Sequence, residues 1–198
     1  MQWKNFVKAI HNSSNNVILN EKKLSIFKSA RVQTVYNFDV LNEFIHHVDR
    51  MKVNGYLHIY GSNIQAINKV VKEFYPGNKI VVATDIFGGI FAISNGDFEG
   101  EKVCIWYYAP DTLQWENLNI DYEHFLQWVL CDDFEQFYIS FCWDGIENTL
   151  NTIGENQAVL IYPYLWSEEC DINTATKKLI SFSELVKINA EYEKQMSV

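Results

Sequence analysis

The stretch TDIFGGIFAISNGDFEGEKVCIWYYAPDTLQWENL (residues 84–118) decides the fold of this chain. It contains three runs typical of strands, IFAIS (90–94), VCIWYY (103–108) and LQWENL (113–118), with short polar connections between them. Short connections between successive strands predict antiparallel pairing. In VCIWYY both alternating sets of side chains are apolar or aromatic, which predicts a central strand covered on both faces of its sheet.

Helical spacing of apolar residues predicts helices on either side of this stretch, among them residues 3–10, 40–48, 64–74 and 122–130. We also expect a helix over residues 21–34 and N-caps at Ser62, Asp121 and Ser183. Further strands are predicted at GYLHIYGS (55–62), KIVVAT (79–84) and LISF (179–182), the last after a loop that reaches residue 178. The whole pattern predicts one α+β domain, residues 1–198, with a mainly antiparallel, twisted sheet and helices packed on one side.

The composition of the chain limits the kinds of molecule that it can be expected to bind and the compartment in which we expect it. The chain has 198 residues and a net charge of −9, with no block of basic residues, which argues against binding to nucleic acid. No apolar run approaches the length of a membrane span, and the N-terminus does not resemble a signal peptide. The four cysteines contain no C-x-x-C pair, so we expect free thiols and a cytoplasmic protein.

No catalytic or metal-binding motif stands out. The five histidines lack ligand spacing, so we expect no metal and no cofactor. The glycine pair Gly88–Gly89 matches no phosphate-binding loop and is better explained by a tight junction between strands. A pocket beside Asp85, Gly88 and Gly89 remains an alternative site for a small molecule or a hydrolytic reaction.

The surplus of aromatic residues is the stronger indication of function, since Trp and Tyr dominate protein interfaces. The candidate binding residues are Trp106, Tyr108, Trp115, Trp143, Tyr164 and Trp166. The acidic residues Asp97, Glu99 and Glu101 are candidates for the rim of such an interface.

Five segments, DIFGGIFAISNG, WYYAPDTLQWENL, YEHFLQWVL, FYISFCWDG and YPYLW, occur in the order typical of an uncharacterised bacterial family of unknown function, which this chain resembles. The family's versions include GGFFAxNG, YYFAPDTLxW and YPFLW. Two departures are FCWDGI, which lacks the family's Pro and second Trp, and His58, where the family has Arg. The order of elements is more distantly similar to the SUKH superfamily of Smi/Knr-type fold, many of whose bacterial members are immunity proteins that neutralise toxins.

These observations favour a non-enzymatic, cytoplasmic protein-binding module. The SUKH resemblance implies a SUKH-like fold and an immunity-like role, with a basic toxin as the protein partner. The alternative is a small-molecule-binding or hydrolytic domain that uses the pocket at Asp85–Gly89.

Overall fold

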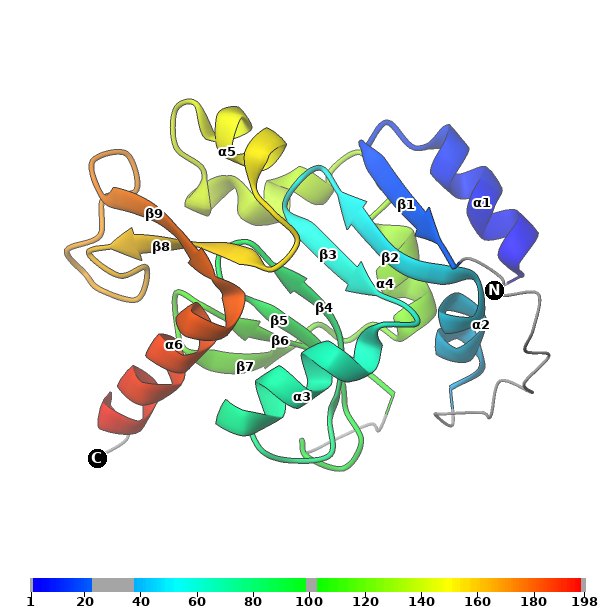
Figure 1. The fold of residues 1–198 in the computed structure, drawn as a ribbon, viewed down its shortest axis with the longest axis horizontal. Helices are drawn as coiled ribbons and strands as arrows, with labels where there is room; N and C mark the ends of the chain where they lie inside the picture. The colour runs from blue at the N-terminus through cyan, green and yellow to red at the C-terminus, as the bar shows by residue number, and fades with distance from the viewer. Residues whose placement is uncertain (1, 23–37, 99–102, 197–198) are drawn as a thin grey trace.

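A computed structural model describes residues 2–22, 38–98 and 103–196 of the chain. Within these residues, a seven-stranded sheet runs through the centre of the molecule, and each pair of neighbouring strands is antiparallel (Figure 1). Its strands follow chain order across the sheet: β1 (Val17–Glu21), β2 (Val48–Val53), β3 (Leu57–Tyr60), β4 (Ile80–Asp85), β5 (Ile90–Ile93), β6 (Ile105–Ala109) and β7 (Gln114–Asn117). A separate antiparallel ribbon consists of β8 (Gln157–Tyr162) and β9 (Thr176–Ser181).

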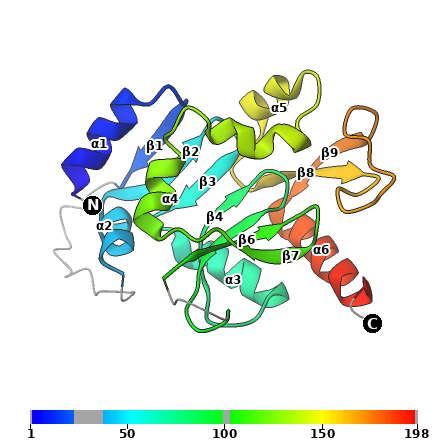
Figure 2. The same ribbon diagram turned by 180° about the vertical axis from the view of Figure 1, so that it is seen from behind.

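Helices pack on both faces of the sheet. They are α1 (Trp3–Asn12), α2 (Asp39–His47), α3 (Ile64–Phe74), α4 (Tyr122–Trp128), the 3-10 helix η1 (Phe134–Phe141), α5 (Ile146–Thr152) and α6 (Phe182–Met196). Figure 1 shows α3 and α6 on the near face, and Figure 2 shows α4 on the opposite face. The α+β class and the antiparallel sheet are confirmed, whereas the expectation of helices on one side only is corrected.

The sequence VCIWYY explains why both faces need cover. Tyr107 of β6 lies beside Phe91 of β5, with ring centroids 4.6 Å apart, and Phe91 packs on Phe125 of α4 at 5.3 Å. The next side chain, Tyr108, points to the other face and donates a hydrogen bond to Glu193 of α6. Strand β6 is therefore covered on both faces, as predicted, but it is not central, because only the edge strand β7 lies beyond it.

The structure corrects the boundary between α2 and the strand that follows it. The sequence predicts a helix through Val48, but α2 ends at His47 and Val48 begins β2. Asn54 and Gly55 then have φ values of 47° and 77°, and the N–H of Tyr56 donates to the carbonyl of Val53. Two central residues with positive φ form the hairpin turn that Asn-Gly favours, so Asn54 and Gly55 connect β2 to β3.

Helix caps are predicted correctly in one case of three. The side chain of Asp121 accepts a hydrogen bond from the N–H of His124, as expected for an N-cap. The hydroxyl of Ser62 instead donates a hydrogen bond to the carboxylate of Asp49, and α3 begins at Ile64. At α6 the hydroxyl of Ser181, not Ser183, accepts a hydrogen bond from the N–H of Glu184.

Two other boundaries differ from the predictions. Strand β9 begins at Thr176, so the expected loop through residue 178 is too long. Most of the helix predicted over residues 21–34 lies outside the described residues. The four cysteines are free thiols in the structure.

Candidate functional site

The turn between β4 and β5 is built around the carboxylate of Asp85, which is only 1% exposed. Its Oδ1 accepts hydrogen bonds from the N–H of Phe87 (2.9 Å) and of Gly89 (2.8 Å), and its Oδ2 accepts one from the Tyr107 hydroxyl (3.0 Å). Gly88 has a φ of +94°, and a Cβ at Gly89 would collide with the Asp85 carboxylate and the Tyr107 ring. The predicted role of the two glycines in a tight junction is confirmed.

Burial raises the pKa of Asp85 to about 6, although the hydrogen bonds from Gly89, Tyr107 and Phe87 act in the opposite direction. A carboxyl group with such a pKa could exchange a proton near neutral pH, as general acid–base catalysis requires. However, the cavity that borders Phe87 has a volume of about 10 Å³, roughly the space of one water molecule. Asp85, Gly88 and Gly89 are all buried and form a closed turn, and none of the three lines this cavity.

A row of polar side chains crosses β2, β3 and β4 on the face of the sheet opposite to Asp85. His58 lies between its cross-strand neighbours Lys52 and Thr84 and is only 3% exposed. Neither ring nitrogen of His58 has a hydrogen-bond partner among the described residues. Burial, followed by the charges of Lys52 and Arg50, lowers the pKa of His58 to about 4. Its imidazole is thus neutral at physiological pH.

His58→Leu should remove the part of the pH dependence of stability that comes from this histidine. The folded state favours neutral His58, so its contribution is complete above the unfolded pKa of about 6.5 and is lost as the pH falls toward about 4. Between about pH 7 and about pH 5 the wild type should lose about 2 kcal/mol more than the variant. Urea unfolding at the two pH values measures this difference. Parallel losses in both proteins would contradict the buried, neutral state of His58.

The remaining histidines do not combine into a metal site. His47 stacks on Trp3 and lies 3.3 Å from a carboxylate oxygen of Glu43, while His124 pairs with Asp121. Among residues 2–22, 38–98 and 103–196, no group of three or more His, Cys, Asp or Glu side chains is placed to hold a metal ion.

Two adjoining hollows flank the loop between α3 and β4, and we call them together the α3–β4 groove. The first has a volume of about 470 Å³, and Lys69 and Lys72 of α3 stand in its wall. The second has a volume of about 440 Å³ and includes Phe98 and Trp115. Both hollows share the loop residues Tyr75, Gly77 and Lys79 in their walls.

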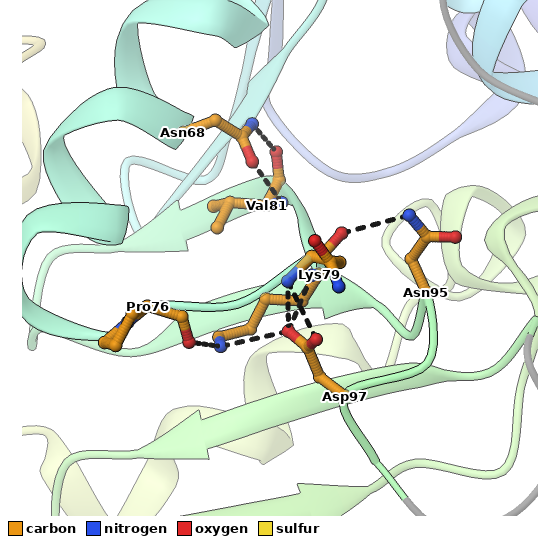
Figure 3. A network of polar contacts seen from close by, with 7 residues as sticks. Asn68, Pro76, Lys79, Val81, Asn95 and Asp97 are labelled. Atoms are coloured by element: carbon orange, nitrogen blue, oxygen red, sulfur yellow. Dashed lines mark hydrogen bonds and ion pairs between the residues drawn. The ribbon is translucent and has the colours of Figure 1, made fainter.

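Polar contacts hold this loop in place (Figure 3). The carboxylate of Asp97 accepts hydrogen bonds from the N–H groups of Asn78 and Lys79, and lies 3.3 Å from the Lys79 ammonium group. Burial alone would raise the pKa of Asp97, but these contacts lower it overall. The side chain of Asn68 accepts from the N–H of Val81 and donates to its carbonyl, so α3 is fastened to β4 (Figure 3).

Aromatic rings form the other wall of the groove. The Lys79 ammonium nitrogen lies 5.8 Å from the ring centroid of Phe98 and 5.5 Å from that of Trp115. Trp106 stacks on Phe98 with centroids 4.4 Å apart, and Tyr108 lies 5.4 Å from Trp115. Four predicted site residues, Asp97, Trp106, Tyr108 and Trp115, therefore gather in and behind this groove.

The other predicted aromatic residues lie elsewhere. Trp143 packs against Phe87, and the ammonium nitrogen of Lys177 lies 5.4 Å from the centroid of a Trp143 ring. Tyr164 and Trp166 stack on each other and contact Tyr192 of α6. Tyr108 is fully buried, and the remaining five are partly buried in such ring clusters. Glu99 and Glu101 lie outside the described residues.

The distribution of charge along the chain belongs to no motif, although it can be read from the sequence. Residues 103–176 contain no Lys or Arg. They contain 13 acidic residues: Asp111, Glu116, Asp121, Glu123, Asp132, Asp133, Glu135, Asp144, Glu147, Glu155, Glu168, Glu169 and Asp171. This segment forms β6, β7, α4, η1, α5 and β8, so these elements carry acidic side chains and no Lys or Arg.

Exposed apolar side chains lie within or beside the acidic elements. Ile139 of η1 is 64% exposed, and the acidic residues nearest to it in the chain, Glu135 and Asp144, are exposed as well. The lining of a hollow of about 280 Å³ includes Glu135, Glu147 and Ile18 of β1, which is 52% exposed. Lys52 also lines it, and its ammonium group donates to the backbone carbonyls of Leu150 and Ile153. We call the exposed surface of η1 and α5 together with Ile18 the acidic surface. It combines carboxylates with apolar contact points.

The described residues include no helix with the length and apolar character that a membrane crossing requires.

Comparison with known proteins gives a family but no activity. A family model described as "Protein of unknown function DUF2625" matches residues 3–185. A "Putative uncharacterized protein YbfG" from Escherichia coli is 38% identical over 115 residues, which are 57% of this chain and 51% of that protein. An "Uncharacterized protein" from Haemophilus influenzae is 32% identical over 112 residues, 57% of this chain and 46% of that protein. The aligned part thus spans about half the length of these relatives.

Proposed function

Because the chain belongs to the DUF2625 family, whose description assigns no activity, we propose its function from its surfaces: it is a non-enzymatic module that binds a basic protein partner through the acidic surface. The observation that carries this proposal is the uniform charge of residues 103–176 around the exposed side chain of Ile139.

The carboxylates and the exposed apolar side chains of the acidic surface together favour a protein as the partner. Carboxylates of one sign on a surface raise the rate at which an oppositely charged protein associates, and salt weakens this effect. A large apolar side chain such as Ile139 loses contact with water only when a partner covers it, which stabilises the complex. In this surface Glu135 and Glu147 supply charge, while Ile18 and Ile139 supply apolar contact.

This assignment moves the expected binding site away from the tryptophans. Trp106 and Trp115 belong to the α3–β4 groove and not to the acidic surface, while the partly buried rings of Trp143 and Trp166 pack against the core. The closed turn at Asp85 gives no observation in favour of a substrate pocket.

The resemblance of the motif order to the SUKH superfamily supports a more specific version of the proposal. In that version the protein is cytoplasmic and acts like an immunity protein, and its partner is a basic toxin such as a nuclease. An acidic surface suits such a partner, because a nuclease needs basic residues to hold phosphate groups.

Photo-crosslinking from Ile139 tests the proposed function. A photoreactive amino acid at this exposed position should capture a basic protein in the native host. The same amino acid at Ala66, an exposed position of α3, is the matched control. Capture of one basic protein from position 139 and not from position 66 is expected. Equal products at both positions, or an acidic product from position 139, would argue against this surface.

A further inference from the structure

We propose that the α3–β4 groove is a second interaction surface, which binds an acidic segment of a protein that also carries a large aromatic side chain. This surface is distinct from the acidic surface, because Trp115 is the one residue of the segment 103–176 among the described lining of the groove.

The charge of the groove is opposite to that of the chain. The net charge is −9, yet Lys69, Lys72, Lys79 and Lys194 line the two hollows. Only Lys79 has an ion-pair partner among the described residues, which is Asp97. Three ammonium groups are therefore available to carboxylates of a partner, and they stand along one groove.

The two hollows differ in chemistry in a way that fits a peptide segment. The first presents Lys69 and Lys72 beside amide side chains such as Asn95, and no acidic residue is among its described lining. The second is bordered by the half-buried rings of Phe98 and Trp115 and by the buried ring of Tyr75. Carboxylates fit the first hollow and an aromatic side chain fits the second, since rings stack favourably on rings.

The groove is held in shape before any partner binds. The contacts of Asp97 fasten the loop Asn78–Lys79, and the two hydrogen bonds between Asn68 and Val81 fix α3 against β4 (Figure 3). A surface with this degree of order loses little conformational entropy when it binds. Asp97 and Glu193 line the second hollow, so it suits an uncharged aromatic side chain and not a carboxylate. Nucleic acid fits less well, because its backbone carries a negative charge at every nucleotide and would place phosphates along both hollows.

The test uses two fluorescent glutamate-rich peptides, one with a central tryptophan and one with serine in its place. Fluorescence anisotropy should show that the full-length protein binds the tryptophan peptide more tightly than the serine peptide. Lys69→Gln combined with Lys72→Gln should weaken binding of both peptides roughly fivefold to tenfold, since both lysines are exposed and lose only their charge. Lys194→Glu, in the second hollow, should weaken it as well.

The matched control is Lys4→Gln combined with Lys8→Gln, which removes two exposed charges from α1. It should leave the affinity for both peptides unchanged. An equal loss in this control would mean nonspecific attraction and would overturn the proposal. Tighter binding of a single-stranded oligonucleotide than of either peptide would replace the protein partner by nucleic acid. A third outcome is that neither peptide binds, whereas the protein associates with itself as its concentration rises and the Lys69, Lys72 variant does not. The occupant of the groove would then be a second copy of this chain.

Discussion

Asp85→Ala is expected to lower the free energy of unfolding by about 3 kcal/mol at neutral pH. The change leaves three buried donors without an acceptor: the N–H groups of Phe87 and Gly89 and the hydroxyl of Tyr107. The loss is limited because Ala also removes a carboxyl group whose ionisation is unfavourable in this buried site. Urea unfolding followed by tryptophan fluorescence measures the effect. An alanine variant as stable as the wild type would contradict the role given to the carboxylate.

Asp85→Asn separates the hydrogen bonds of this turn from its charge. The amide oxygen can accept from Phe87 and Gly89, and the amide nitrogen can donate to Tyr107. The folded-state pKa of about 6 lies above the usual value of 3.8, so the contribution of the wild-type carboxyl is complete below about pH 4 and is lost as the pH rises through about 6. Between about pH 5 and about pH 7.5, the Asn variant should therefore gain more than about 1 kcal/mol relative to the wild type.

The pH dependence of Asp85 is opposite in sign to that of His58. The wild type should consequently show a shallow pH profile, and each single variant should reveal the contribution of the remaining group. A wild type and an Asp85→Asn variant with parallel profiles would contradict the raised pKa of this carboxyl.

Gly89→Ala is the second change with a large expected effect. Its Cβ would occupy the space of the Asp85 carboxylate and the edge of the Tyr107 ring, which are themselves joined by a hydrogen bond and buried. Neither neighbour can move without breaking that contact, so we expect a loss of about 3–5 kcal/mol or failure to fold.

Gly96→Ala is the matched control for Gly89→Ala. Gly96 has a φ of +95° but no atom within 4 Å of an added Cβ, so the variant should lose only about 1 kcal/mol through backbone strain. An equal loss of unfolding free energy in the two variants would show that the turn accommodates a Cβ at Gly89. The close packing around Asp85 would then not be required for stability.

The three strands of residues 84–118 could be predicted because their pattern is local. Alternation in LQWENL and the double-sided apolar pattern of VCIWYY reflect which faces of the sheet are covered. Strand β2 was missed because Arg50 and Lys52 dilute its apolar pattern, and because Val48, its first residue, continues the helical spacing of the preceding apolar residues. The caps at Ser62 and Ser183 failed because the partner of each hydroxyl depends on how distant or neighbouring residues fold.

The candidate site was less predictable than the fold. Nothing in the sequence places Lys79 between Phe98 and Trp115, since this arrangement depends on how the α3–β4 loop meets the β5–β6 connection and β7. Whether a tryptophan is exposed also depends on tertiary packing. By contrast, the absence of Lys and Arg from residues 103–176 needs no structure, and the structure adds that Ile139 is exposed among these acidic elements.

The most direct test of the acidic surface is the association rate of the protein captured from position 139, measured at low and high salt. For the wild type, salt should lower the association rate at least about tenfold and leave the dissociation rate nearly unchanged. In Glu135→Gln combined with Glu147→Gln, association at low salt should be slower and less sensitive to salt, whereas Ile139→Ser should chiefly speed dissociation. Association rates that respond neither to salt nor to the loss of the two carboxylates would contradict recognition through this surface.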